Sequence, residues 1–175
     1  EITLPTGIDK DGKDRTAVCC LSSLNIEKYD EWKDDPDMIG DVMRFLDNVL
    51  SDFINKAPEQ FKDAKYSAER ERSVGLGVMG FHSFLQKKRI PLESVMAKSW
   101  NKKIFKNIHE KVNQASKDLA EERGACPDAA EYGYKERFSN KTAIAPTASI
   151  SIICGGASPG VEPIAANSYT HKTLS

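Results

Sequence analysis

The stretch AIAPTASISIICGGASPGVEP, residues 143–163, places a short apolar run, a proline and two hydroxyl residues in the order of a strand, a turn and a helix. The apolar run is Ala143–Ala145, and the turn residues Thr147 and Ser149 carry the hydroxyls. A helix that opens after such a turn has free backbone N–H groups in its first turn, and these favour an anion such as a phosphate. The same hydroxyls also suit helix capping inside a buried turn. The residue pattern alone leaves both interpretations open.

Composition and charge describe a globular domain without a dominant electric field. The chain has 175 residues, of which 39% are hydrophobic and 29% charged, and 25 basic against 26 acidic residues leave a net charge of −1. This balance does not favour nucleic acid or an anionic membrane as a partner. No apolar run approaches the roughly 20 residues that span a bilayer. The start EITLPTG does not look like a signal peptide and lacks an initiator Met, which suggests a piece of a longer or processed protein.

The four cysteines are not spaced as a metal site or a disulfide framework. They are Cys19, Cys20, Cys126 and Cys154, and no pair forms CxxC. The three histidines show no metal-ligand spacing either, so we expect no metal site. By default we expect each cysteine to pack as a small buried hydrophobic side chain, and the protein to lie in a reducing cytoplasm.

Two long helices are predicted from apolar residues that recur at spacings of three and four. The first covers residues 37–56 and starts after Asp35-Pro36, and the second lies within residues 91–123 and ends at Gly124. A short charged helix is predicted at 62–72, and a charged turn at 8–15. Short strands are predicted at 2–4, 16–21 and 142–145. Alternating strands and helices favour an α/β layout, but the strands are too few to close a sheet, so the fragment needs partners that cover its edges.

The segment SVGLGVMG, residues 73–80, formally contains GxGxxG with glycines at 75, 77 and 80. It is a weak match to a dinucleotide-binding loop, because the next helix is short and no acid is well placed about 20 residues later. A close-packed crossing of two backbone segments is the better interpretation of these glycines.

Six segments, taken in order, carry a resemblance to a known family. They are EITLPT at 1–6, TAVCCLSSLN at 16–25, SVGLGVMGF at 73–81, LAEERGACP at 119–127, APTASISII at 145–153 and GVEPIAANSYTHKTLS at 160–175. Together they closely resemble the catalytic large subunit of class I ribonucleotide reductases. The resemblance implies an α/β fold in which residues 1–175 form part of a ten-stranded α/β barrel, the partial catalytic barrel domain, with long helices outside short strands. It also implies radical-based reduction of ribonucleoside diphosphates to deoxyribonucleoside diphosphates, the precursors of DNA.

The resemblance assigns catalytic roles to Glu1 and Cys19. The family places its radical cysteine in the pattern Asn-x-Cys-x-Glu, so Glu1 matches the glutamate that acts as general base on the ribose 3′-hydroxyl. The Asn and the radical cysteine would then precede Glu1. Cys19 matches one half of the family's redox disulfide, whose other half lies outside the chain, and we expect an accessible and partly ionised thiol. Adjacent side chains on a strand point to opposite faces, so Cys20 faces away from the substrate.

The resemblance also favours the phosphate interpretation of the turn. The family's substrate phosphate site is matched by Pro146, Thr147, Ala148 and Ser149. The resemblance implies that this turn binds the diphosphate through its N–H and hydroxyl groups. Cys126 and Cys154 match no catalytic position.

The implied cofactors and partners lie mostly outside this chain. The chain itself binds no cofactor; a metal-containing small subunit supplies the radical, thioredoxin or glutaredoxin supplies reducing dithiols, and other regions of the large subunit bind nucleotide effectors. The partners are thus the substrate, the rest of the large subunit, the small subunit and the reductant, with neither membrane nor nucleic acid. The 175 residues alone are expected to be inactive. Two alternatives stay open: a cobalamin-dependent reductase, and a non-catalytic scaffold domain derived from the barrel.

Overall fold

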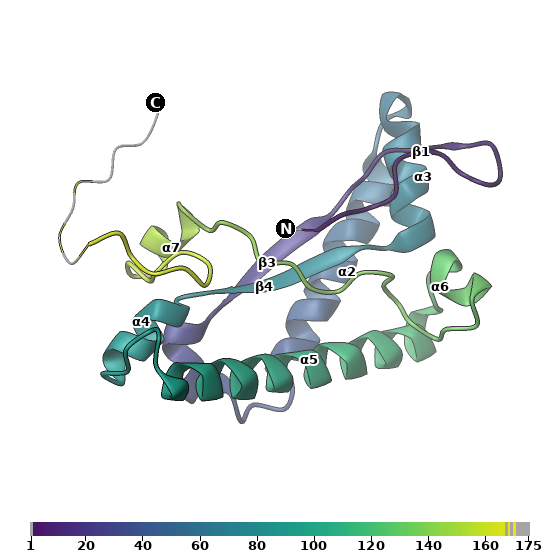
Figure 1. The fold of residues 1–175 in the computed structure, drawn as a ribbon. Helices are drawn as coiled ribbons and strands as arrows, with labels where there is room; N and C mark the ends of the chain where they lie inside the picture. The colour runs from purple at the N-terminus through teal and green to yellow at the C-terminus, as the bar shows by residue number, and fades with distance from the viewer. Residues whose placement is uncertain (1, 167, 169, 171–175) are drawn as a thin grey trace.

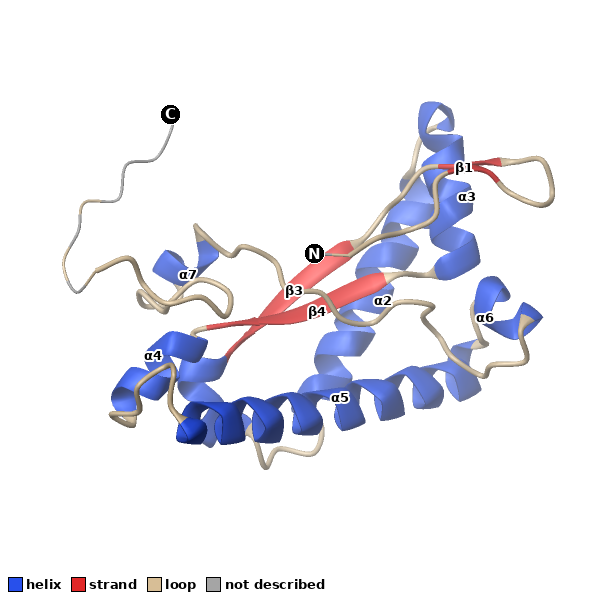
Figure 2. Ribbon diagram, viewed as in Figure 1, coloured by secondary structure: helices blue, strands red, loops and turns tan. Residues whose placement is uncertain are grey.

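A computed structural model describes residues 2–166, 168 and 170 of the chain. Its order of elements is β1 (Gly7–Ile8), β2 (Asp14–Arg15), β3 (Cys20–Asn25), η1 (Ile26–Lys28), α1 (Tyr29–Trp32), α2 (Met38–Lys56), η2 (Glu59–Phe61), α3 (Lys62–Glu71), β4 (Val74–Met79), α4 (Phe81–Lys87), α5 (Val95–Arg123), α6 (Pro127–Glu131) and α7 (Ile150–Ile153). Figure 2 shows that helices dominate and that the strands are short.

The centre of the fold is a parallel pair of strands. β3 pairs with β4 in a register that runs from Cys20 opposite Val74 to Asn25 opposite Met79. Parallel strands need a long crossover, and α2 and α3 provide it. Along the other edge of β4 a later segment of the chain runs parallel to the strand and pairs with it through a single bridge, between Leu76 and Thr142. The described residues form a β-α-β-α unit with a third strand-like segment, and no closed barrel.

One face of β4 packs on the hydrophobic core, to which both α2, behind the strands in Figure 1, and α5, below them, contribute buried residues. Val74, Leu76 and Val78 belong to this core and are at most 1% exposed. Because strand side chains alternate, Gly75 and Gly77 turn to the opposite face. The strand is therefore buried on both sides, as in sheets with elements on both faces.

The glycine face of β4 confirms the predicted close-packed crossing. A Cβ atom at Gly77 would lie 2.0 Å from the carbonyl oxygen of Ala143. At Gly75 it would lie 2.5 Å from Leu21 Cδ2 and 2.8 Å from Ala143 Cβ. Glycine is required here because neighbouring segments occupy the space of a side chain.

Both long helices form where the apolar spacing predicts them. Asp35 Oδ1 accepts hydrogen bonds from the N–H groups of Asp37 and Met38, which fixes the start of α2. Ser94 Oγ accepts a hydrogen bond from Ala97 N at the start of α5, and Gly124, with φ +87°, ends it. The charged turn between β1 and β2 and the short helix α3 also match their predictions.

The predicted strands differ from the observed ones. Residues 2–4 form no strand, and the strand predicted at 16–21 lies at Cys20–Asn25 instead. Ser22 and Ser23, which follow the predicted strand, pair opposite Leu76 and Gly77 of β4. The predicted strand at 142–145 contributes only the bridge at Thr142, because no further strand borders it in the described part of the chain.

A buried carboxylate in α2 joins the ends of two helices and one loop residue. Asp47 of α2 is fully buried and accepts hydrogen bonds from Arg72, Arg123 and Arg137, at distances from 2.6 to 3.2 Å. Burial alone would raise the pKa of Asp47, but the three guanidinium groups hold it below its usual value. The network fixes the end of α3, the end of α5 and residue 137 against α2.

Candidate functional site

Cys19 lies just before β3, on the face of the sheet that carries Gly75. Its Sγ is 3.4 Å from the position that a Cβ at Gly75 would occupy. The next residue, Cys20, packs against the hydrophobic core instead. The two thiols therefore lie on different faces, and Cys19 shares its face with Leu21 and Ala143. The predicted catalytic residue Glu1 lies outside the described residues.

The Cys19 thiol is protonated at neutral pH. Burial, assisted by Cys20 and the negative charge of Glu71, raises its pKa to about 11. This corrects the expectation of a partly ionised thiol: in this environment Cys19 holds its proton. Such a group donates a proton or hydrogen more readily than it attacks as a thiolate. The cysteines of the described residues are free thiols.

The turn at residues 146–149 opens the one-turn helix α7. Thr147 adopts the left-handed conformation with φ +54° and is 7% exposed. Its Oγ1 accepts a hydrogen bond of 2.8 Å from Gly160 N, so its own O–H hydrogen is left to donate. Ala148, Ser149 and Ile150 are exposed, and in the described part of the chain no partner accepts a hydrogen bond from their N–H groups. Successive free N–H groups beside a left-handed residue form a concavity suited to an anion.

Both ends of this turn are tied to β4 and α4. Upstream, Ala143 N donates to Leu76 O. Downstream, Ser158 and Ser83 exchange hydrogen bonds, each backbone N–H donating to the hydroxyl of the other, at 3.1 and 2.9 Å. Gly80 N also donates to Ser158 O at 2.7 Å. The turn therefore lies at the carboxyl end of β4 (Figure 1).

Cys19 and the turn are linked through Ala143, which lies on the same face of β4 as the thiol. Both Cys19 and Ala143 border the space above Gly75. From Ala143 to Thr147 the chain has four residues, which span at most about 14 Å. The thiol and the turn are thus connected along one face of β4, the thiol near its amino end and the turn at its carboxyl end.

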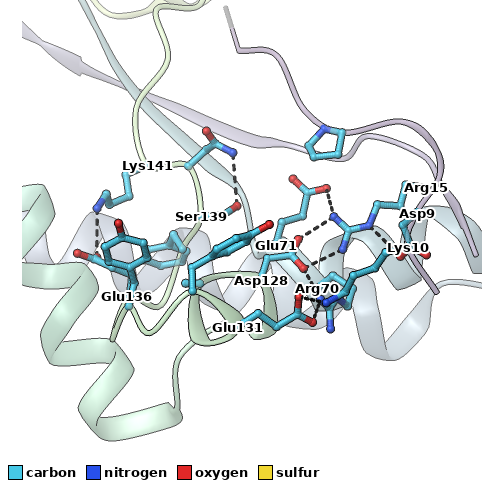
Figure 3. Close-up of a pocket in the computed structure, with 16 residues that line it drawn as sticks. Asp9, Lys10, Arg15, Arg70, Glu71, Asp128, Glu131, Glu136, Ser139 and Lys141 are labelled. Carbon is cyan, nitrogen blue, oxygen red and sulfur yellow. Dashed lines mark hydrogen bonds and ion pairs between the residues drawn. The ribbon is translucent and has the colours of Figure 1, made fainter.

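A cavity of about 720 Å³ lies beside the β1–β2 hairpin. Figure 3 shows its charged lining, in which Arg15 makes two hydrogen bonds to Asp128, at 2.7 and 2.9 Å. Glu71 points into it, and its side chain is 2% exposed. These residues carry no recognisable sequence pattern, because they come from segments far apart in the chain and share no motif.

The described residues contain no cluster of three or more His, Cys, Asp or Glu side chains placed to hold a metal ion. None of the described helices is both long and apolar enough to cross a bilayer.

Comparison with known proteins decides the family. The model of the ribonucleotide reductase barrel domain matches residues 1–137 and 128–175. The chain belongs to the ribonucleotide reductase family. The family resemblance and the partial α/β barrel expected from the sequence are both confirmed.

Three members of the ribonucleotide reductase family illustrate the similarity. The large subunit of ribonucleoside-diphosphate reductase from Invertebrate iridescent virus 6 is 51% identical over 175 residues, covering 100% of this chain and 18% of the viral protein. A vitamin B12-dependent ribonucleoside-diphosphate reductase from Thermoplasma acidophilum is 39% identical over 168 residues, which cover 89% of this chain and 21% of that protein. The solved structure of the class Id ribonucleotide reductase alpha subunit from Actinobacillus ureae superposes with a TM-score of 0.82 at 41% identity. The match covers 87% of this chain and 29% of that subunit. The chain thus spans less than a third of each of these relatives.

Proposed function

We propose that this chain forms part of the active site of a ribonucleoside-diphosphate reductase, an oxidoreductase that makes deoxyribonucleoside diphosphates. The observation that carries the proposal is the single face of β4 that joins a protonated thiol, Cys19, to a turn with free N–H groups, residues 146–149. The family match over the whole chain supports the same reaction. The rest of the barrel and of the site belongs to the longer protein.

The turn is proposed to bind the substrate diphosphate. The N–H groups of Ala148, Ser149 and Ile150 and the Ser149 hydroxyl are available to donate to phosphate oxygens. Thr147 shapes the turn by accepting from Gly160 N and keeps its O–H hydrogen to donate, and Pro146 fixes the entry of the chain. Hydrogen bonds to a charged group contribute about 1.5–3 kcal/mol each, enough to orient a diphosphate.

Cys19 is proposed to be one of two thiols that reduce the ribose. In the reaction the 2′-carbon–oxygen bond breaks, the oxygen leaves as water, and a C–H bond replaces it. The two thiols supply two hydrogens, that is two electrons and two protons, and end as a disulfide. A thiol that is still protonated at neutral pH suits the delivery of a proton to the departing hydroxyl. A dithiol such as thioredoxin or glutaredoxin then restores both thiols by exchange.

Glu1 is proposed as the general base on the 3′-hydroxyl, in keeping with the family pattern. The radical that starts the reaction is proposed to come from a metal-containing small subunit, and the effector sites to lie elsewhere in the large subunit. A cobalamin-dependent reductase is the second candidate, because a vitamin B12-dependent relative is 39% identical to this chain. A cobalamin requirement for turnover would select that candidate. The free thiols suit a cytoplasmic location.

The test uses the longer reductase that contains this chain, assayed with a small subunit and a dithiol. Cys19→Ser should abolish dithiol-dependent turnover and leave the Kd of the nucleoside diphosphate unchanged, whereas the matched control Cys20→Ser should retain turnover. Ser149→Ala should raise that Kd by roughly tenfold or more, from the loss of one charged hydrogen bond. Unchanged turnover in Cys19→Ser would refute the redox role, and an unchanged Kd in Ser149→Ala would favour the scaffold interpretation.

A further inference from the structure

The cavity of Figure 3 is a second polar site, separate from the turn at 146–149. It has a volume of about 720 Å³ and is bordered by the β1–β2 hairpin, the end of α3, α6 and residues 134–141. Two tyrosines with well-exposed rings stand on its wall, Tyr132 at 80% and Tyr134 at 65% exposure. A cavity of this size accommodates a large side chain or a small ligand.

Each lining carboxylate other than Glu71 has a cationic nitrogen within 3.5 Å. Arg15 bonds to Asp128 through both terminal nitrogens, and its Nε lies 3.5 Å from Asp9. Arg70 and Lys10 both pair with Glu131. Separately, Lys141 pairs with Glu136 at 3.1 Å.

Glu71 is the exception. Its Oε2 accepts a hydrogen bond from Ser73 Oγ at 2.7 Å, but its Oε1 has no hydrogen-bond partner among the described residues. The nearest cation in the cavity is Arg15 Nη1, 3.9 Å away and already bonded to Asp128. The side chain is only 2% exposed, so water compensates it poorly.

The cavity lining carries one more acidic than basic side chain. Its carboxylates are Asp9, Glu71, Asp128, Glu131 and Glu136, and its cations are Lys10, Arg15, Arg70 and Lys141. Five acids against four bases leave a net charge of −1. Burial raises the pKa of Glu71, Ser73 and Arg15 lower it, and Asp128 raises it further. An added cation at Oε1 would balance the lining and lower that pKa.

We propose that this cavity receives an arginine side chain from the polypeptide of the longer reductase outside residues 1–175, with its guanidinium donating an N–H to Glu71 Oε1. Arginine fits better than lysine, because a planar guanidinium stacks on tyrosine rings while it donates in the plane. The source is polypeptide because the relatives are several times longer than this chain. The contact would fix the hairpin and α6 against the rest of the subunit, and it does not depend on the proposed reaction.

The first test offers the 175-residue chain N-acetylarginine amide, with the neutral isostere N-acetylcitrulline amide as the matched probe. The Glu71 carboxyl carbon is followed by NMR. The arginine probe should shift this signal with saturation in the millimolar range, and the citrulline probe should not. Glu71→Gln should weaken binding of the arginine probe at least tenfold, while Glu136→Gln, a lining carboxylate that pairs with Lys141, should change it less than threefold. If the arginine and citrulline probes shifted the Glu71 signal equally, the proposal would be overturned, whatever the variants show.

The second test separates a polypeptide occupant from a free small cation. A photo-crosslinking residue in place of Tyr132 in the full reductase should link to an arginine-containing peptide outside residues 1–175. Crosslinks confined to residues 1–175 would overturn the proposed source. Neither outcome depends on turnover, so a failed proposal here leaves the proposed function untouched.

Discussion

The glycine face of β4 offers the sharpest test of how this fold is packed. In Gly77→Ala the new methyl group would lie 2.0 Å from the carbonyl oxygen of Ala143, where ordinary contact is 3.4–4 Å. The obstacle is backbone, so the segment at 142–144 must move by more than 1 Å, or β4 must bend. Overpacking of this kind costs about 1–3 kcal/mol of unfolding free energy. The displaced segment leads directly to the turn at 146–149, so the variant should also weaken diphosphate binding in the longer reductase.

Urea unfolding of the 175-residue chain measures the cost. With a slope of about 2 kcal/mol per molar urea, the midpoint of Gly77→Ala should fall by about 0.5–1.5 M. The control is Gly40→Ala in α2, where a Cβ meets nothing within 4 Å. Alanine favours the helix by about 0.5–1 kcal/mol, so that midpoint should rise. If Gly77→Ala were as stable as the parent chain, the close crossing of β4 by residues 142–144 would be refuted.

Two further predictions concern titrating groups. Asp47→Asn should lower the unfolding free energy at pH 7 by roughly 3 kcal/mol, because three guanidinium groups lose their buried partner. Since the folded pKa of Asp47 is lowered, its contribution is present above about pH 4, the unfolded value, and is lost as pH falls through the folded pKa. Unfolding curves of the parent and the variant should therefore converge on acidification, and a constant difference down to pH 2 would contradict the network. Alkylation of Cys19 by iodoacetamide, followed by mass spectrometry against Cys19→Ser, should accelerate about tenfold per pH unit from pH 7 to 10, because the pKa is about 11. A rate that levels off below pH 9 would show an ionised thiol.

The sequence was sufficient for features that depend on local spacing. The helices α2 and α5 carry apolar residues at helical intervals, and their starts and ends are fixed by neighbouring side chains such as Asp35 and by Gly124. The glycines of β4 also indicated close packing correctly, since few other roles explain two glycines inside an apolar run. The order of six family segments supplied the fold class, which composition could not.

Features that depend on distant partners were not accessible from the sequence. The strand predicted at 16–21 lies at Cys20–Asn25, because its position is set by pairing with β4, a segment far along the chain. The environment of Cys19 was also missed: the thiol was expected to ionise, but burial raises its pKa. Asp47 and its three arginines, like Glu71 and its cavity, join segments with no shared motif. The roles of Glu1, Cys19 and residues 146–149 stay predictions.

The reciprocal hydrogen bonds between Ser83 and Ser158 have a consequence for affinity. Because they clamp the downstream arm of the turn to α4, while Ala143 holds the upstream arm to β4, an anion bound as proposed would meet donors whose geometry is already set. Little conformational entropy is then lost on association, and such preorganisation lets a small number of N–H groups bind tightly. A substitution at Ser83, which lies in α4 outside the turn, would thus alter the proposed phosphate recognition.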